Sequence, residues 1–243
     1  MRPLLLAGIG SILLATLAAA QEYVVTPEGH RVRLELAWYG PTHKAPYTTD
    51  VPVEKYTFYK DAEGNRVLHG EYARLFVNGR MKDFTTYVHG VKDGPFGGLS
   101  DNKRVSVTGQ YRHGRLEGAV TWYYDSGVIQ KEEFYVAGEL HGPFAAYHDN
   151  GNKKEVVRFV RGMKDGPFTE YHRNGQPAFE GTYVRGYITG KLTVYGPLGV
   201  KRGEGLLDEE WIVGGWQCFA PNGQLERVRS DCDGSFYMEC TCP

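Results

Sequence analysis

Short runs of alternating apolar and polar residues recur along this chain, with the two-residue period of β-strands. In one such run Phe179 and Tyr183 share a face, while Thr182 and Val184 share the opposite one. The runs are rich in β-branched and aromatic residues, which fit a pleated surface. They include Val120–Tyr124, Glu155–Val160 and Phe168–Tyr171. After the first twenty residues, no stretch favours a helix.

A longer pattern is superimposed on these strands. An aromatic residue, two residues, a glycine, three residues and a second glycine return every 24 positions. The copies are Tyr87-Gly90-Gly94, Tyr111-Gly114-Gly118, Tyr135-Gly138-Gly142, Phe159-Gly162-Gly166 and Tyr183-Gly186-Gly190. A fixed period in this range indicates one supersecondary unit stacked on copies of itself. We therefore predict a repeat protein whose function lies on its surface.

A second series places an aromatic residue four positions before a glycine, at the same interval and twelve residues out of phase. Its members are Tyr123-Gly127, Tyr147-Gly151, Tyr171-Gly175, Tyr195-Gly199 and Phe219-Gly223. Glycine supplies the positive φ of a tight turn, and Asn-Gly pairs are a strong hairpin signal. Two turns per repeat imply two strands per repeat. The prediction is an all-β fold in which consecutive hairpins form one elongated antiparallel sheet.

The aromatic residues of the first series occupy equivalent positions in successive hairpins. We therefore expect a ladder of rings across every second strand, made by Tyr111, Tyr135, Phe159 and Tyr183. Because cross-strand aromatic pairs stabilise sheets, we interpret this ladder as packing rather than as a platform for a ligand.

The segments Tyr147-His-Asp-Asn-Gly151 and Phe159-Val-Arg-Gly162-Met-Lys-Asp-Gly166 resemble the bacterial variant of the MORN repeat, over roughly residues 56 to 225. That variant occurs in an antitoxin-like family associated with toxin–antitoxin systems. The resemblance implies consecutive hairpins in one elongated sheet, and it implies little about chemistry.

The repeat pattern weakens at both ends of the array. It departs before Tyr87, and after Gly205 the segment Leu207–Trp211 replaces the aromatic and glycine turn. Terminal repeats are expected to be degenerate because they must cover an exposed sheet edge.

The first twenty residues have a different character. Arg2 is followed by an apolar run from Pro3 to Ala20, which ends in three alanines before Gln21. A positive start, an apolar core and small residues at the end are typical of a secretory signal peptide. We expect cleavage after about Ala20 and a secreted or periplasmic protein. The alternative is an uncleaved membrane anchor, although the run is short of the ~20 residues that a spanning helix needs.

These patterns divide the chain into four parts. They are a signal peptide at residues 1–20, an N-terminal extension at 21–55, a hairpin repeat array at 56–206, and a degenerate last repeat with a cysteine-rich cap at 207–243.

The four cysteines, Cys218, Cys232, Cys240 and Cys242, all lie in the last part of the chain. After export they would form two disulfides that hold a C-terminal cap over the last strand. Cys240 and Cys242 are too close in sequence to bridge each other without strain, so each is expected to pair with Cys218 or Cys232. A four-cysteine zinc site is the alternative, but the spacings do not match paired zinc knuckles.

Charge and candidate catalytic residues exclude several functions. Lys and Arg total 28 and Asp and Glu total 29, so the net charge of −1 offers no basic footprint for nucleic acid or anionic lipid. His89 and His113 lie one period apart, as do His148 and His172. Since strands of successive hairpins hold such residues about 10 Å apart, we interpret them as polar residues beside turns rather than metal ligands. We expect no enzyme activity, cofactor or metal.

Three functions are compatible with this sequence. The first is an exported scaffold that binds another protein along its hairpin array, because repeats make an extended surface and aromatic residues are typical anchors. The second is a module that binds cell-wall polysaccharide, in which tryptophans such as Trp122, Trp211 and Trp216 stack on sugar rings. The third, inhibition of an exported toxin, is implied by the resemblance alone.

Overall fold

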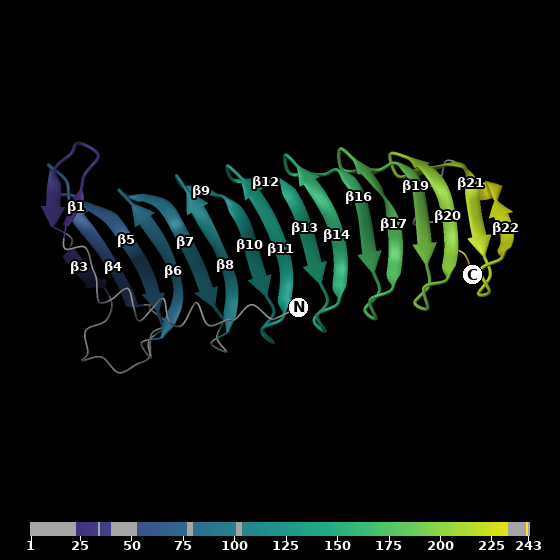
Figure 1. Ribbon diagram of the computed structural model, residues 1–243, viewed down its shortest axis with the longest axis horizontal. Coiled ribbons are helices and arrows are strands. Elements are labelled where there is room, and N and C mark those ends of the chain that lie inside the picture. Colours follow the sequence, from purple (N-terminus) through teal and green to yellow (C-terminus); the bar gives the residue numbers. More distant parts are fainter. Residues whose placement is uncertain are drawn as a thin grey trace, which may run out of the picture. The chain divides into compact units, whose positions relative to one another are not determined.

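The computed structural model describes residues 23–33, 35–39, 53–76, 80–100, 104–232 and 242. The chain divides into two compact units, Met1–Val91 and Lys92–Pro243, and Figure 1 shows the strands of both. The expected signal peptide lies outside the described residues. No described helix is long and apolar enough to cross a membrane.

The first unit contains two antiparallel groups of strands. In the smaller group β1 (Tyr23–Val25) pairs with β2 (Arg31–Arg33). The larger group runs in chain order through β3 (Glu35–Tyr39), β4 (Val53–Lys60), β5 (Arg66–Leu75) and β6 (Met81–Val88). Phe58, Tyr59 and Ala73 are its most buried apolar residues.

The second unit is an antiparallel array in chain order, which begins with β7 at the boundary between the units. Its strands are β7 (Val91–Leu99), β8 (Val105–Arg112), β9 (Arg115–Leu116), β10 (Gly118–Tyr123), β11 (Ile129–Val136), β12 (Glu139–Leu140), β13 (Gly142–Tyr147), β14 (Lys153–Val160), β15 (Met163–Lys164), β16 (Gly166–Tyr171), β17 (Pro177–Val184), β18 (Tyr187–Ile188), β19 (Gly190–Tyr195), β20 (Lys201–Asp208), β21 (Trp211–Phe219) and β22 (Leu225–Arg229). A 3₁₀ turn, Ser230–Cys232, follows β22. The prediction of an all-β fold of consecutive antiparallel hairpins is confirmed.

The spacing of the two glycines in the repeat motif has a backbone cause. In the turn after β14, Arg161 and Gly162 have φ of 49° and 77°, as in a type I′ hairpin turn. The N–H of Gly162 donates to the carbonyl of Leu140 in the preceding hairpin, at 2.9 Å. Gly166 then has φ of 106°, where a bulge separates β15 from β16. The first glycine therefore forms the turn and the second forms the bulge.

The other turn of each repeat is a three-residue loop. Gly151 donates its N–H to the carbonyl of His148, and His148 donates to the carbonyl of Asn152. Gly151 has φ of 88°, while Asn150 is not at positive φ. This is a type I turn followed by a left-handed glycine. The Asn-Gly pair thus marks a hairpin, as the sequence indicated, with glycine alone in the left-handed conformation.

The turn at the start of β21 keeps the repeat geometry without the repeat sequence. Glu209 and Glu210 have φ of 48° and 76°, which match the values in the glycine-containing turns. Glu210 donates its N–H to the carbonyl of Ile188 at 2.8 Å, just as Gly186 donates to Lys164 at 2.8 Å. Glu210 therefore stands in a backbone conformation that glycine occupies in the other repeats, with a steric cost at Cβ.

One face of the second unit's sheet, which we call the aromatic face, is packed by rings that lie over glycines. Phe168 pairs in register with Gly181, and its ring centroid lies 4.6 Å from that of Tyr183. A Cβ on Gly181 would lie 2.8 Å from the Phe168 ring, so only glycine leaves room for it. Phe96 lies over Gly109 in the same way.

The core of the second unit extends along the aromatic face to the C-terminal strands. It comprises Val157, Phe168, Tyr183, Ile188, Leu192, Leu207, Ile212, Trp216, Cys218 and Cys232. Cys218 is disulfide-bonded to Cys242, across 24 residues. Cys232 is disulfide-bonded as well, and Cys240 lies outside the described residues. The cysteines therefore act as the predicted staple of a C-terminal cap.

The Glu210 turn gives a direct test of the backbone argument. Glu210→Gly should raise the free energy of unfolding by about 1 kcal/mol, because glycine adopts positive φ without a Cβ clash. Glu210→Ala removes the carboxylate but keeps the strained backbone, so it should give no such gain. Urea unfolding followed by circular dichroism measures both variants, and equal gains would assign the effect to charge instead.

Candidate functional site

The second unit's sheet has an outer face, opposite the aromatic face, and one row of paired residues defines it. The row consists of Thr121, Glu132, Ala145, Val156, Thr169, Glu180, Thr193 and Glu204, each opposite the next in register. Residues two positions along each strand share the same face. This row divides the outer face into a half near the three-residue loops and a half near the two-residue turns.

The half near the three-residue loops satisfies its own polar groups. Tyr147 donates its hydroxyl to Glu132 at 2.7 Å, and Tyr195 donates to Glu180 at 2.7 Å. Burial, followed by the bond to Glu132, raises the pKa of Tyr147 to about 12. The bond to Glu180 is the main cause that raises the pKa of Tyr195 to about 12. These phenols stay protonated near neutral pH and act as fixed donors.

The half near the two-residue turns is more exposed and carries apolar side chains beside polar ones. Its exposed polar residues include Arg158, Thr182 and Lys191, and Lys191 lies opposite Leu206. Phe134 lies opposite Ala119, Val184 opposite Tyr187, and Leu206 opposite Val213. We call the exposed apolar residues of this region the apolar strip. It consists of Phe134, Val136, Met163, Val184, Tyr187, Leu206 and Val213, whose exposed fractions run from 37% to 58%. Exposed apolar side chains gathered in one region mark an interaction surface, whereas scattered single ones do not.

Charged residues flank the apolar strip at the two-residue turns, and their sign changes along the array. Arg112 and Arg115 make the first turn of the array basic. Later turns carry Glu139, Arg161 and Arg185 in succession, and all of these side chains are exposed. The last turn is acidic, with Asp208 and Glu209 exposed and Glu210 partly exposed. The two-residue turns are therefore oppositely charged at the two ends of the array.

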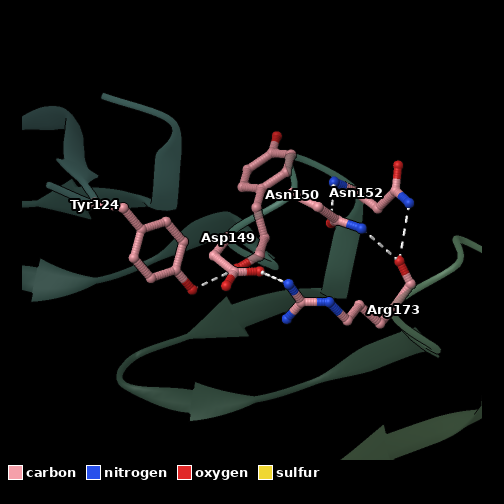
Figure 2. A network of polar contacts seen from close by, with 6 residues as sticks. Tyr124, Asp149, Asn150, Asn152 and Arg173 are labelled. Atoms are coloured by element: carbon pink, nitrogen blue, oxygen red, sulfur yellow. Dashed lines mark hydrogen bonds and ion pairs between the residues drawn. The ribbon is translucent and has the colours of Figure 1, made fainter. Parts of the chain in front are cut away.

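The edge formed by the three-residue loops is a structural network (Figure 2). Asn150 and Asn152 donate their side-chain amides to the carbonyl of Arg173, at 2.8 and 2.9 Å. The Arg173 guanidinium pairs with Asp149 at 2.6 Å, and Tyr124 donates its hydroxyl to the carbonyl of residue 147 at 2.8 Å. Side chains of one loop thus bond the backbone of the next, which fixes the register between hairpins.

The histidines of this edge belong to the same network. The Nε2 atom of His148 bonds the carbonyl of Tyr171 at 3.0 Å, and that of His172 bonds the carbonyl of Tyr195 at 2.9 Å. Since a carbonyl only accepts, Nε2 carries the proton in both rings. Among the described residues, no three His, Cys, Asp or Glu side chains gather in a way that would hold a metal ion.

A polar cluster interrupts the aromatic face at β10 and β11. Glu133 is only 8% exposed and accepts hydrogen bonds from Trp122 Nε1 at 2.8 Å and from Tyr135 at 3.3 Å. Lys131 pairs with it at 2.7 Å and lies 5.1 Å above the Trp122 ring. Burial, with the Glu133 charge, raises the pKa of Tyr135. The buried carboxylate is thus compensated, as a structural ion pair requires.

A second charged group on the aromatic face joins β14, β15 and β16. Glu155 lies opposite Glu170 in register, and Lys164 pairs with Glu155. Burial raises the pKa of Glu170, and the Glu155 charge adds to that shift. The bond to Glu155 helps to raise the pKa of Lys164 against the opposing effect of burial. One ammonium therefore faces two neighbouring carboxylates.

The three tryptophans expected to stack on sugars have different environments. Trp216 is only 2% exposed, and its ring lies against Gly203 and Gly205, where a Cβ would come within 2.6 Å of it. Trp122 is 36% exposed and bonds Glu133, and Trp211 is 55% exposed. Trp216 is therefore part of the core and unavailable as a stacking surface.

The first unit contains a cluster that the sequence did not suggest. The Tyr59 hydroxyl lies 3.2 Å from His89 Nδ1, and the N–H of His89 donates to His69 Nδ1 at 3.3 Å. Burial, reinforced by the His89 charge, lowers the pKa of His69. His113, its partner in the sequence pattern, instead lies 3.2 Å from Asp93 in the second unit. The shared 24-residue period therefore did not give these two histidines the same contacts.

Comparison with protein families agrees with this repeat geometry. A family model described as MORN repeat variant matches residues 116–137 and 164–185. The matches start 48 residues apart (164 − 116), which is twice the 24-residue period, and each covers one three-residue loop with strands on both sides. The chain therefore carries MORN-variant repeats at these two positions. No curated protein matches the chain.

The carboxylate pair on the aromatic face predicts a pH-dependent effect on stability. Because the pKa of Glu170 is raised in the folded state, its charged form costs stability at neutral pH, and protonation removes that cost. Glu170→Gln should therefore raise the free energy of unfolding at pH 7, and the gain should disappear below the ordinary Glu pKa of 4.5. Urea unfolding at pH 7 and pH 3.5 measures it, with the exposed Glu139→Gln as the control. A loss of stability at pH 7 would contradict the assignment.

Proposed function

We propose that this chain is an exported, non-catalytic repeat scaffold that binds another protein along the apolar strip. The observation that carries the proposal is the strip itself, because exposed apolar side chains gather beside the two-residue turns of successive hairpins, with Val136 and Val184, and Met163 and Tyr187, at equivalent positions of the repeat. Burial of such residues is the main favourable term in protein association.

The surroundings of the strip resemble the anatomy of a protein interface. Aromatic and aliphatic side chains, including Phe134, Tyr187 and Leu206, occupy its middle. Charged residues lie at the turns along its rim, where water can reach them. An apolar centre with a polar rim is the usual arrangement of specific protein interfaces. The rigid hairpins would present these anchors at little entropic cost.

Two features support export. The apolar run from Pro3 to Ala20 has the organisation of a signal peptide. Cys218 forms a disulfide with Cys242, and Cys232 is disulfide-bonded as well, which suits an oxidising compartment.

The protein-binding role is favoured over the polysaccharide-binding one because of the tryptophans. Sugar stacking needs exposed, planar aromatic rings, and the ring of Trp216 is enclosed in the core. Trp122 has its indole N–H bonded to Glu133 and Lys131 over its ring. The inhibition of an exported toxin, implied by the resemblance, stays a prediction.

The binding surface is tested by removing its anchors. The variant Val184→Ser, Tyr187→Ser, Leu206→Ser should lose at least tenfold in partner binding while its far-ultraviolet spectrum stays the same, because all three side chains are exposed. Quantitative affinity capture from the native source measures the loss.

A matched control removes exposed apolar residues outside the strip. Leu198→Ser, Leu225→Ser, Val228→Ser changes three such side chains and should leave capture intact. Equal capture by the strip variant and the unchanged chain would contradict the proposed surface.

Export is tested by the mass of the mature protein. Signal cleavage predicts a chain that begins at Gln21 and is recovered from outside the cytoplasm with its thiols oxidised. Intact-mass measurement before and after reduction and alkylation detects both features. A full-length mass that retains Met1 to Ala20 would contradict cleavage.

A further inference from the structure

The spacing of the apolar strip limits the partners that can match it. Each repeat contributes two long strands, so equivalent side chains recur at about 10 Å. The two-residue turns themselves repeat every 24 residues, and a second copy of this chain has turns at the same spacing.

The charges beside the strip distinguish the ways in which two copies can face each other. If the copies ran in the same direction, each turn would face its own equivalent. Arg112 and Arg115 would then oppose themselves, and Asp208 and Glu209 would oppose themselves. Like charges in direct opposition disfavour such a contact.

Reversing one copy turns the same charges into complementary pairs. With a two-fold axis through the turn at Arg161, the basic turn at Arg112 and Arg115 faces the acidic turn at Asp208 and Glu209. The next turns inward face each other as well, which places Glu139 opposite Arg185. Because the axis repeats every contact, four of the five turns meet opposite charge.

At the axis itself Arg161 faces its own copy. Its side chain is exposed at the tip of the turn, so the guanidinium can remain in water while its aliphatic part packs. Nearby Met163 and Val160 lie opposite each other on the outer face and supply an apolar centre. Arg158, two residues from Val160 on the same face of β14, is a second exposed basic residue close to the axis.

We propose that the protein bound on the apolar strip is a second copy of this chain, packed outer face against outer face in the reversed direction about the Arg161 turn. This inference rests on the proposed function, since it names the partner of the same surface. With the axis at the Arg161 turn, Val136 faces the turn of Val184 and Tyr187, and Val160 and Met163 face their own copies, whereas Leu206 and Val213 face the Arg112 turn, which adds no residue to the strip. The first group supplies the apolar contact, and the end charges select the orientation.

Charge reversal tests the orientation. An acidic variant, Arg112→Glu with Arg115→Glu, and a basic variant, Asp208→Arg with Glu209→Arg, should each weaken self-association about tenfold or more. Combining all four changes in one chain should restore the dimer, because the two turns again carry opposite charge. Sedimentation equilibrium of the mature chain over a range of concentrations measures each dissociation constant.

The substitutions are compatible with the local structure. Arginine already occupies the position equivalent to Glu209 in two turns, as Arg161 and Arg185, and both have φ close to that of Glu209. Lys153→Glu with Lys154→Glu changes the net charge as much as the acidic variant does, on exposed residues next to a three-residue loop. This control should leave the dissociation constant unchanged.

Several outcomes would overturn the inference. They are a chain that remains monomeric at all concentrations, a dimer that none of the charge reversals weakens, and a combined variant that fails to recover. If the chain stays monomeric but its strip variant still loses capture of a different protein, the partner is not a second copy. The proposed function would then stand. A dimer that survives the Val184, Tyr187 and Leu206 substitutions would show that the copies associate through another surface, which would overturn the inference and leave the proposed function to be judged by the capture experiment.

Discussion

The structure depends on positive φ at fixed places in each repeat. At Arg161 and Gly162 it reverses the chain in two residues, and at Gly166 it allows the bulge that follows. These reversals determine the register of each strand pair, and a slip of one residue would exchange the two faces. The turn N–H also bonds the preceding hairpin, so one conformation sets both the hairpin and its attachment to its neighbour.

Both faces of a single layer of strands meet solvent, and in this sheet the two faces are covered in different ways. On the aromatic face, rings such as Phe168 lie down over glycines and shield the backbone without a second layer. On one half of the outer face, Tyr147 and Tyr195 donate hydrogen bonds to carboxylates of neighbouring strands. On the other half, Lys191 pairs with Glu204 beside Leu206, while the residues of the apolar strip stay exposed. The strip is therefore the surface from which a partner gains most by excluding water.

The C-terminal end shows how geometry persists where the repeat sequence fades. Glu209 and Glu210 adopt the same turn as the glycine-containing pairs, because neighbouring strands and the bond to Ile188 hold them there. Trp216 lies over two glycines, as phenylalanine lies over one in earlier repeats, and a disulfide joins Cys218 to Cys242. Larger rings and a covalent link thus strengthen the last hairpins.

The sequence by itself determined the strands, the hairpins and the 24-residue repeat, because glycine is the residue that adopts positive φ freely and its spacing is visible in the chain. It did not indicate the turn at Glu209 and Glu210, the buried Trp216 or the contact between His69 and His89. It also gave no sign of the apolar strip. Those features depend on side chains that are distant in sequence and are brought together by cross-strand register. Only the tertiary structure decided which apolar residues became core and which remained exposed to water.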